Sequence, residues 1–124
     1  MADSDRRPSV WVGHISLTTN CLAESNEFMV NLGMRSLVKG DDFAVLELRA
    51  GTHLILQARD QIEPGDAPFD LMVEDLDATH SRLAELGMSP SEISGGQIHR
   101  SFGVRDPSGH VVKFNSSHVS DQPV

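Results

Sequence analysis

The sequence predicts an α+β protein in which two tandem βαβββ modules form a curved mixed sheet around a cavity. The first observation is a repeated tripeptide: Leu32-Gly33-Met34 occurs again as Leu86-Gly87-Met88. The second is the order of one strand, one helix and three strands, which is predicted twice, on either side of a polar linker. One module of this kind cannot bury the face of its sheet alone, whereas two modules can do so together. Internal repetition therefore decides the predicted architecture.

Module one begins with a predicted strand at residues 10–19, where apolar and β-branched side chains alternate with polar ones. Asn20 is expected to cap the helix that follows, by accepting a hydrogen bond from a free amide in its first turn. Gly33 is expected to end this helix, because glycine takes the left-handed backbone conformation without strain. Three short strands follow, with turns between them at residues 39–42 and 50–52.

Module two repeats this order. A strand is predicted at residues 69–74, Asp75 then caps a helix, and Gly87 ends it. The last three strands are predicted at residues 91–93, 98–105 and 110–115, with a tight Asp106-Pro107-Ser108-Gly109 turn before the final one. The predicted boundaries give one domain at residues 10–118, with module one at 10–58, a linker at 59–68 and module two at 69–118.

The composition limits the classes of function. With a formal net charge of −8, the chain lacks the basic surface that general nucleic-acid binding requires, and it suits a cationic small-molecule ligand. No apolar run reaches the roughly 18 residues of a membrane span, and residues 1–7 lack the apolar segment of a signal peptide. Cys21 is the only cysteine, which excludes an intrachain disulfide and favours a reducing, cytoplasmic location.

The repeated modules, the helix ends "NLGM" and "ELGM", and the turn in "VRDPSGHVVKF" together resemble the vicinal oxygen chelate superfamily. This superfamily includes glyoxalase I, extradiol dioxygenases, fosfomycin resistance proteins and bleomycin-binding resistance proteins. The resemblance covers residues 10–118 and implies the fold described above. It also implies a homodimer, because many relatives form their cavities at or near a subunit interface. The reaction does not follow from the fold, since function depends on the site.

The resemblance also implies where a metal would be bound. Metal-using relatives hold a divalent ion with His, Glu or Gln side chains from the first and last strands of each module. His14 matches the first of these positions, but Ile55, Pro68 and Lys113 stand at the other three. A lysine ammonium has no lone pair and would repel a dication. We therefore expect no catalytic metal ion, with His14 as the one remaining metal-ligand candidate and a divalent ion as the alternative.

Five residues are predicted to bind a ligand in the cavity: His14, His53, Gln57, Asp70 and Lys113. Each has a simpler interpretation that the sequence leaves open. The two histidines are equally compatible with a strand histidine that bonds a carbonyl or faces solvent. Lys113 is equally compatible with a lysine that extends outward. If Lys113 instead faces inward, it is expected to form a buried ion pair with Asp70, because a buried ammonium needs a partner.

Other side chains are assigned to the core or the surface. Met72 is predicted to lie in the core with Phe28 and Met29, and Trp11 in the core or in a dimer interface. His110 is predicted to be exposed.

Three classes of function remain compatible with the sequence. The first is a metal-free protein that sequesters a small molecule, such as a cationic antibiotic, as bleomycin-type resistance proteins do. The second is a metal-dependent lyase, isomerase or dioxygenase with an unusual ligand set. The third is a module whose pocket has no present chemistry. Because Ile55, Pro68 and Lys113 occupy expected ligand positions, we favour the first class over the second and predict no catalytic residue.

Overall fold

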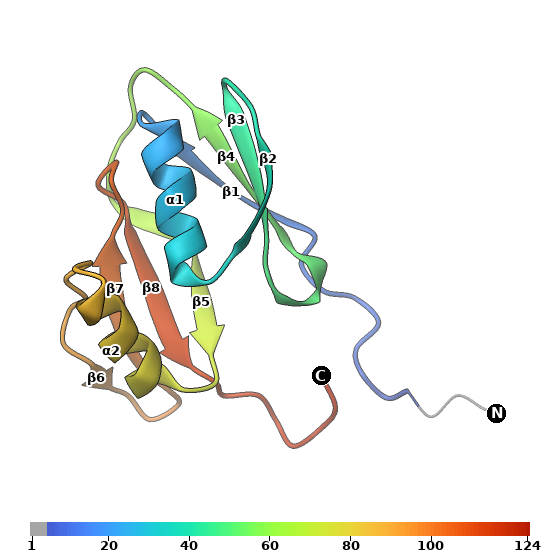
Figure 1. Cartoon of the computed structure of the whole chain (residues 1–124). Coiled ribbons are helices and arrows are strands. Elements are labelled where there is room, and N and C mark those ends of the chain that lie inside the picture. The colour runs from blue at the N-terminus through green and yellow to red at the C-terminus, as the bar shows by residue number, and fades with distance from the viewer. Residues whose placement is uncertain (1–4) are drawn as a thin grey trace.

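The structure is a computed structural model that describes residues 5–124. The prediction that no signal peptide is present rests partly on residues 1–4, which lie outside the described residues. The chain folds into two modules with the same element order, as Figure 1 shows. Module one consists of β1 (His14–Thr19), α1 (Leu22–Leu32), β2 (Arg35–Lys39), β3 (Phe43–Glu47), the short 3-10 turn η1 (Arg49–Gly51) and β4 (His53–Ala58). Module two consists of β5 (Asp66–Val73), α2 (Leu76–Glu85), β6 (Ser94–Gly95), β7 (Arg100–Arg105) and β8 (Val111–Ser116).

The strands form two four-stranded mixed sheets with equivalent topology. The first sheet has the order β1-β4-β3-β2 and the second the order β5-β8-β7-β6. In each sheet the first and last strands of the module pair in parallel, and the remaining neighbours pair antiparallel. The predicted α+β fold of two βαβββ modules is therefore confirmed, with two separate sheets that do not close.

The repeated Leu-Gly-Met tripeptide is explained by the way both helices end. Gly33 and Gly87 have φ angles of 123° and 79°, in the left-handed region that favours glycine. The next residue then donates its amide to the carbonyl five residues earlier, from Met34 to Met29 and from Met88 to Leu83, with N···O distances of 3.2 and 3.1 Å. This bond satisfies a carbonyl that the end of a helix would otherwise leave free.

The two helices begin differently. Asp75 caps α2 as predicted, because its Oδ1 accepts the amide of Ala78 at 2.9 Å. The predicted cap at Asn20 is wrong, because α1 begins only after Cys21, whose side chain makes no capping bond. Thr19, at the end of β1, instead fixes the residue that precedes the helix. Its buried Oγ1 accepts the amide of Cys21 at 3.0 Å and lies 2.6 Å from the Ser25 hydroxyl.

Three strands begin at least three residues away from the predicted position, and in each case pairing decides the boundary. β1 begins at His14 rather than at residue 10, because its pairing with β4 starts there. β5 begins at Asp66, inside the predicted linker, because Asp66 already pairs with Val111 of β8. β6 lies at Ser94–Gly95 rather than at 91–93, since these two residues pair with β7.

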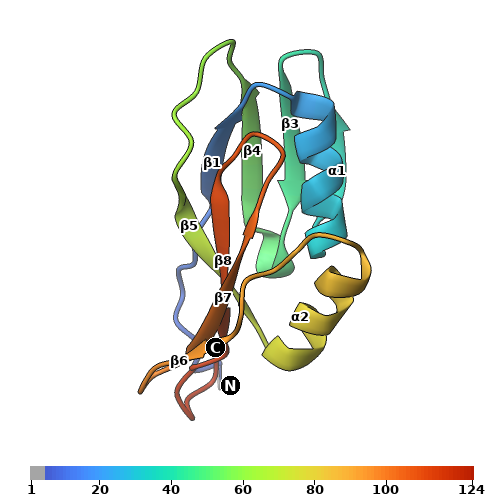
Figure 2. The ribbon, with the colours of Figure 1, turned by 90° about the vertical axis from the view of Figure 1, so that its left-hand side faces the viewer.

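Both helices cover the same side of the two sheets, as Figure 2 shows. Helix α1 packs on β2, β3 and β4, and α2 packs on β7 and β8. The strand residues that face the helices form the buried apolar core: Leu17, Ala44, Leu46, Leu54, Leu56, Phe102, Val104, Val112 and Phe114. No helix formed by residues 5–124 covers the opposite faces of the sheets, and we call these the open faces. Within the described residues, neither helix is long and apolar enough to cross a membrane.

Two predicted burials are wrong. Met72 is 47% exposed, because it lies on the open face of its strand. Trp11 was predicted to lie in the core or in a dimer interface; it is 67% exposed within one chain, so it is not a core residue. His110 was predicted to be exposed, but it is buried, and its Nε2 lies 2.9 Å from the Thr18 carbonyl oxygen. This contact joins the turn before β8 of module two to β1 of module one.

Candidate functional site

The five predicted ligand-binding residues all lie on the open faces. Side chains alternate along a strand, so the neighbours of His14, His53 and Lys113 point into the core. The buried residues Leu54, Leu56, Val112 and Phe114 show this alternation. The parallel pairing then places His14 beside His53 and Asp70 beside Lys113. The structure therefore brings the predicted residues together in two groups, one on each sheet.

The first group is larger than predicted. The imidazole rings of His14 and His53 have centroids 5.9 Å apart and meet at 67°. The Nε2 atom of His53 lies 3.3 Å from Oε2 of Glu47, and the other carboxylate oxygen of Glu47 lies 2.8 Å from Nη2 of Arg35. These four residues, His14, His53, Glu47 and Arg35, come from four neighbouring strands, and we call them the histidine–glutamate cluster.

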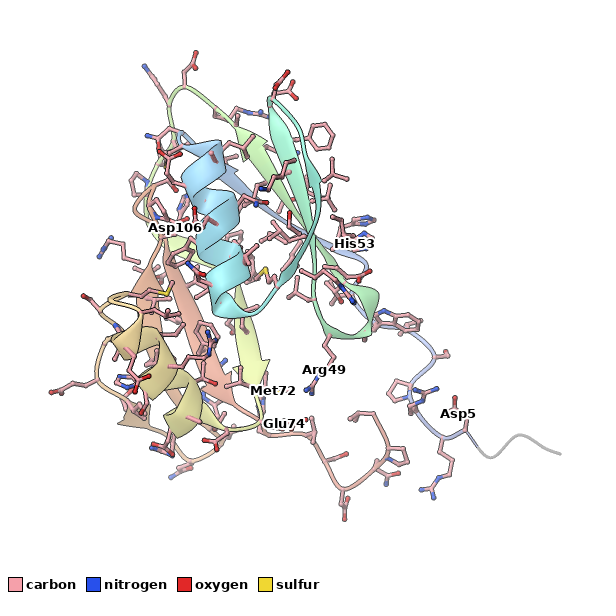
Figure 3. The ribbon with its side chains drawn as sticks, in the orientation of Figure 1. Asp5, Arg49, His53, Met72, Glu74 and Asp106 are labelled. Carbon is pink, nitrogen blue, oxygen red and sulfur yellow. The ribbon has the colours of Figure 1, made fainter. Side chains whose placement is uncertain are left out.

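Glu47 is the centre of this cluster. The hydrogen bond with His53 lowers the pKa of Glu47, and the positive charge of Arg35 acts in the same direction against partial desolvation. Glu47 therefore stays a carboxylate and fixes the His53 ring, which is about one-third exposed. In Figure 3, His53 projects from the sheet on the side away from α1.

Glu47 and Arg35 did not figure in the sequence prediction, although one signal was available. The alternation in "FAVLE" puts Phe43, Val45 and Glu47 on one face of β3, opposite the buried Ala44 and Leu46. The missing information was that β3 lies next to β4 with Glu47 opposite His53, a register that depends on the turn between the strands.

Apolar side chains lie beside the cluster on the same open face. Ile55 stands between His53 and Gln57 along β4, and Val45 of β3 is its register partner. The amide oxygen of Gln57 accepts a hydrogen bond of 3.2 Å from Arg59. A ligand on this face would thus meet apolar surface flanked by hydrogen-bonding groups.

The predicted buried ion pair between Lys113 and Asp70 is wrong in this chain. The Lys113 side chain is 57% exposed, and its Nζ lies 3.8 Å from Oδ2 of Asp66. Register alone does not bury a pair, because the open face of the second sheet has no covering element. An ion pair of this exposure contributes little stability.

The residues present do not fit a divalent metal ion within one chain. Ile55 and Pro68 offer no donor atom, and Lys113 offers a cation. His14, His53 and Glu47 carry suitable donor atoms, but no group of three or more His, Cys, Asp or Glu side chains in residues 5–124 is placed to hold one ion. A transition-metal site with a catalytic position needs about three protein ligands.

A comparison with sequence models of protein families assigns the chain to a family. The model of the Glyoxalase/Bleomycin resistance protein/Dioxygenase superfamily matches residues 11–114. The chain belongs to this superfamily. No protein of curated function matches this superfamily member closely in sequence.

Solved structures of the superfamily share the fold. Lactoylglutathione lyase from Agrobacterium tumefaciens superposes with a TM-score of 0.76 at 15% identity, over 90% of this chain and 97% of that one. The fosfomycin resistance protein FosX from Listeria monocytogenes gives 0.72 at 16% identity, over 87% and 93%. A glyoxylase/bleomycin resistance protein/dioxygenase domain from Frankia sp. EAN1pec gives 0.69 at 23% identity, over 89% and 99%. At these identities the likeness shows the fold alone.

Proposed function

We propose that this superfamily member binds a small molecule on its open sheet faces without a catalytic metal ion. The observation that carries the proposal is the histidine–glutamate cluster. It places two imidazoles, one of them fixed by a carboxylate, on a surface that no helix covers. Apolar Ile55 and Val45 lie beside it, and a few placed polar groups on apolar surface are typical of small-molecule sites. Gln57, Asp70 and Lys113 would supply further polar contacts.

The ligand is proposed to be a cation, and an antibiotic is one candidate. The net charge of −8 attracts cations over long range and disfavours nucleic acid as a partner. Antibiotic sequestration is suggested by the superfamily, which includes bleomycin resistance proteins, and by the shared fold of the fosfomycin resistance protein FosX. The single cysteine, which is free, is compatible with a cytoplasmic location.

We also propose that the protein forms a homodimer through its open faces. Phe43 and Met72 are 42% and 47% exposed on these faces, and Trp11 is 67% exposed beside β1. A second copy would cover this apolar surface, which a monomer leaves in water. Light scattering at micromolar concentration tests the proposal, and a monomeric mass would contradict it.

Elemental analysis combined with a thermal-shift screen of drug-like cations tests the binding function. The purified protein is expected to contain no stoichiometric metal. A cation at a hundred times its dissociation constant is expected to stabilise the fold by about 2.7 kcal/mol. The Glu47→Gln variant is expected to weaken binding, whereas His118→Gln, in the exposed tail, serves as the matched control. If the parent, Glu47→Gln and His14→Ala proteins bind the cation equally well, the cluster is not part of the binding site.

A metal-dependent lyase, isomerase or dioxygenase is the second candidate. It is favoured by one observation, namely that two imidazoles and a carboxylate occur together in one cluster. In a dimer, the open face of the other copy would complete the ligand set. About one bound ion per chain, retained on dialysis and lost in His14→Ala, would favour this candidate over the first.

A further inference from the structure

A cleft of about 970 Å³ separates the two modules on the helix side of the sheets. β1 and β5 approach each other at one end, where Thr18 and Pro68 line one small pocket together. Toward the other end of these strands the modules diverge, and the cleft opens between them. Its size lies within the range of small-molecule sites, which often form between domains. We call it the intermodule cleft.

The walls of the intermodule cleft are apolar and come from both modules. The residues that supply them also pack against the core: Ile15, Leu32, Met34, Leu48, Phe69 and Leu71. They lie on the opposite side of the strands from the histidine–glutamate cluster. The cleft is therefore a different site from the one proposed above, although Asp70 borders both.

The charges around the cleft favour a cation. Three carboxylates line it, those of Asp70, Glu74 and Asp75, against the two guanidiniums of Arg49 and Arg82. Both guanidiniums already have partners within the protein. Arg82 donates to the carbonyls of Asn31 and Leu32 at the end of α1, at 2.8 and 3.2 Å. Arg49 lies 3.0 Å from Glu74. The three carboxylates and two guanidiniums leave one net negative charge at the cleft, and both guanidiniums are already bonded within the protein.

The pair of Arg49 and Glu74 spans the mouth of the cleft. Arg49 belongs to η1 of module one and Glu74 follows β5 of module two, and Figure 3 shows Arg49 pointing across toward Glu74 and Met72. Both side chains are highly exposed, at 82% and 75%, so the bond between them is weak and readily exchanged. A guanidinium of the protein itself therefore occupies the position that a ligand cation would take.

The turn that carries Arg49 is strained. Ala50 has a φ of 66°, a left-handed conformation that is unfavourable for a residue with a side chain. Strained residues of this kind are concentrated at binding and switch sites. The turn thus holds Arg49 over the cleft at a conformational cost.

We propose that the intermodule cleft binds an organic cation with an aromatic or other apolar body, whose ammonium or amidinium group replaces Arg49 on Glu74. The apolar body would lie against Met72, Met34 and the apolar walls, and the carboxylates of Asp70 and Asp75 would add attraction. This site goes beyond the proposed function, because it does not use the histidine–glutamate cluster, although Asp70 borders both sites.

A pair of probes with the same ring and opposite charge tests the proposal. Naphthylmethylammonium and naphthoate are titrated into full-length protein that carries carbon-13 methyl groups on its methionines. Met34 and Met72 line the cleft, whereas Met29 is fully buried in the core away from it. The ammonium is expected to shift the methyl signals of Met34 and Met72 at millimolar concentration and to leave Met29 unchanged. Absence of these shifts, or larger shifts with naphthoate, would overturn the proposal.

Two substitutions with opposite expected effects give the second test. Glu74→Gln is expected to weaken binding of the ammonium about fivefold to tenfold, because it removes the charged acceptor. Arg49→Gln is expected to strengthen it about twofold to fivefold, because it removes the competing cation. Glu85→Gln, an exposed change of the same type on α2, is the control and is expected to have no effect. Effects of the same sign in both variants would overturn the proposal.

The result is separable from the test of the open faces. If Glu47→Gln loses cation binding while the methyl shifts of Met34 and Met72 stay unchanged, the result supports a site at the histidine–glutamate cluster and leaves the intermodule cleft unaffected. If Glu74→Gln loses the methyl shifts of Met34 and Met72 while binding at the cluster stays unchanged, the result supports a site in the intermodule cleft and leaves the cluster unaffected.

Discussion

Replacing Asp106 with alanine is expected to lower the free energy of unfolding by about 3–4 kcal/mol, through the loss of three hydrogen bonds. Asp106 lies in the turn before β8 and is buried. Its Oδ1 accepts the amide of His110 at 2.7 Å, the amide of Ser108 at 3.1 Å and the hydroxyl of Ser108 at 3.0 Å. A hydrogen bond contributes roughly 1 kcal/mol net, so the three donor groups account for about 3 kcal/mol, and the two backbone amides that alanine leaves without an acceptor raise the expected loss further.

Asp106→Asn separates the acceptor from the charge. The asparagine oxygen can take the position of Oδ1 and keep these donors paired, so the expected loss is only about 1 kcal/mol. The turn also positions His110, whose ring contacts the Thr18 carbonyl in module one. Failure of the turn is therefore expected to loosen the contact between the modules as well.

Urea denaturation followed by circular dichroism measures both losses. Asp121→Ala, in the exposed tail, is the control and is expected to stay within about 0.5 kcal/mol of the parent. Equal losses for the alanine and asparagine variants, or an alanine variant as stable as the control, would refute the reasoning. In either case the hydrogen bonds to Asp106 would not be what stabilises the turn.

Three further outcomes are expected. Ala50→Gly should raise the free energy of unfolding by about 0.5–1 kcal/mol, because glycine relieves the left-handed strain. Ala84→Gly, within α2, should lower it by about the same amount. Changes of the same sign in the two variants, measured by urea denaturation, would contradict this. The lowered pKa of Glu47 means that its stabilisation is present above its unfolded pKa and is lost as pH falls through the folded value. Glu47→Gln should therefore make the acid side of the stability–pH curve shallower than in the parent, and an unchanged curve would count against the cluster. Lys113→Met should change stability by less than about 0.5 kcal/mol, because its pair with Asp66 is exposed; a loss of about 3 kcal/mol or more would indicate a buried pair.

Part of the fold could be predicted because its signals are local. Gly33 and Gly87 can be recognised as helix ends from the sequence, because glycine is the residue most often found in the left-handed conformation that follows a helix. Alternation along residues 53–58 likewise places His53, Ile55 and Gln57 on one face of β4, because successive side chains of a strand point to opposite sides. Asp75 was recognised as a cap because its carboxylate bonds an amide only three residues ahead.

Where the prediction failed, a partner distant in the sequence decided the outcome. The start of α1 is the exception, because the contact there is local: Thr19 rather than Asn20 accepts an amide, that of Cys21, the residue before the helix. Lys113 lies near Asp66 rather than in a buried pair with Asp70, because no element of this chain covers that face. His110 is buried because module one packs against its turn.

The sequence by itself determined the two-module architecture and both helix ends. These features follow from periods of two and 3.6 residues and from the backbone preferences of single residues. Only the tertiary structure decided that Glu47 fixes His53, and that Arg49 meets Glu74 across a cleft between the modules. Both contacts depend on strand register and on the angle between two sheets, which are set by packing over the whole chain and not by any local segment.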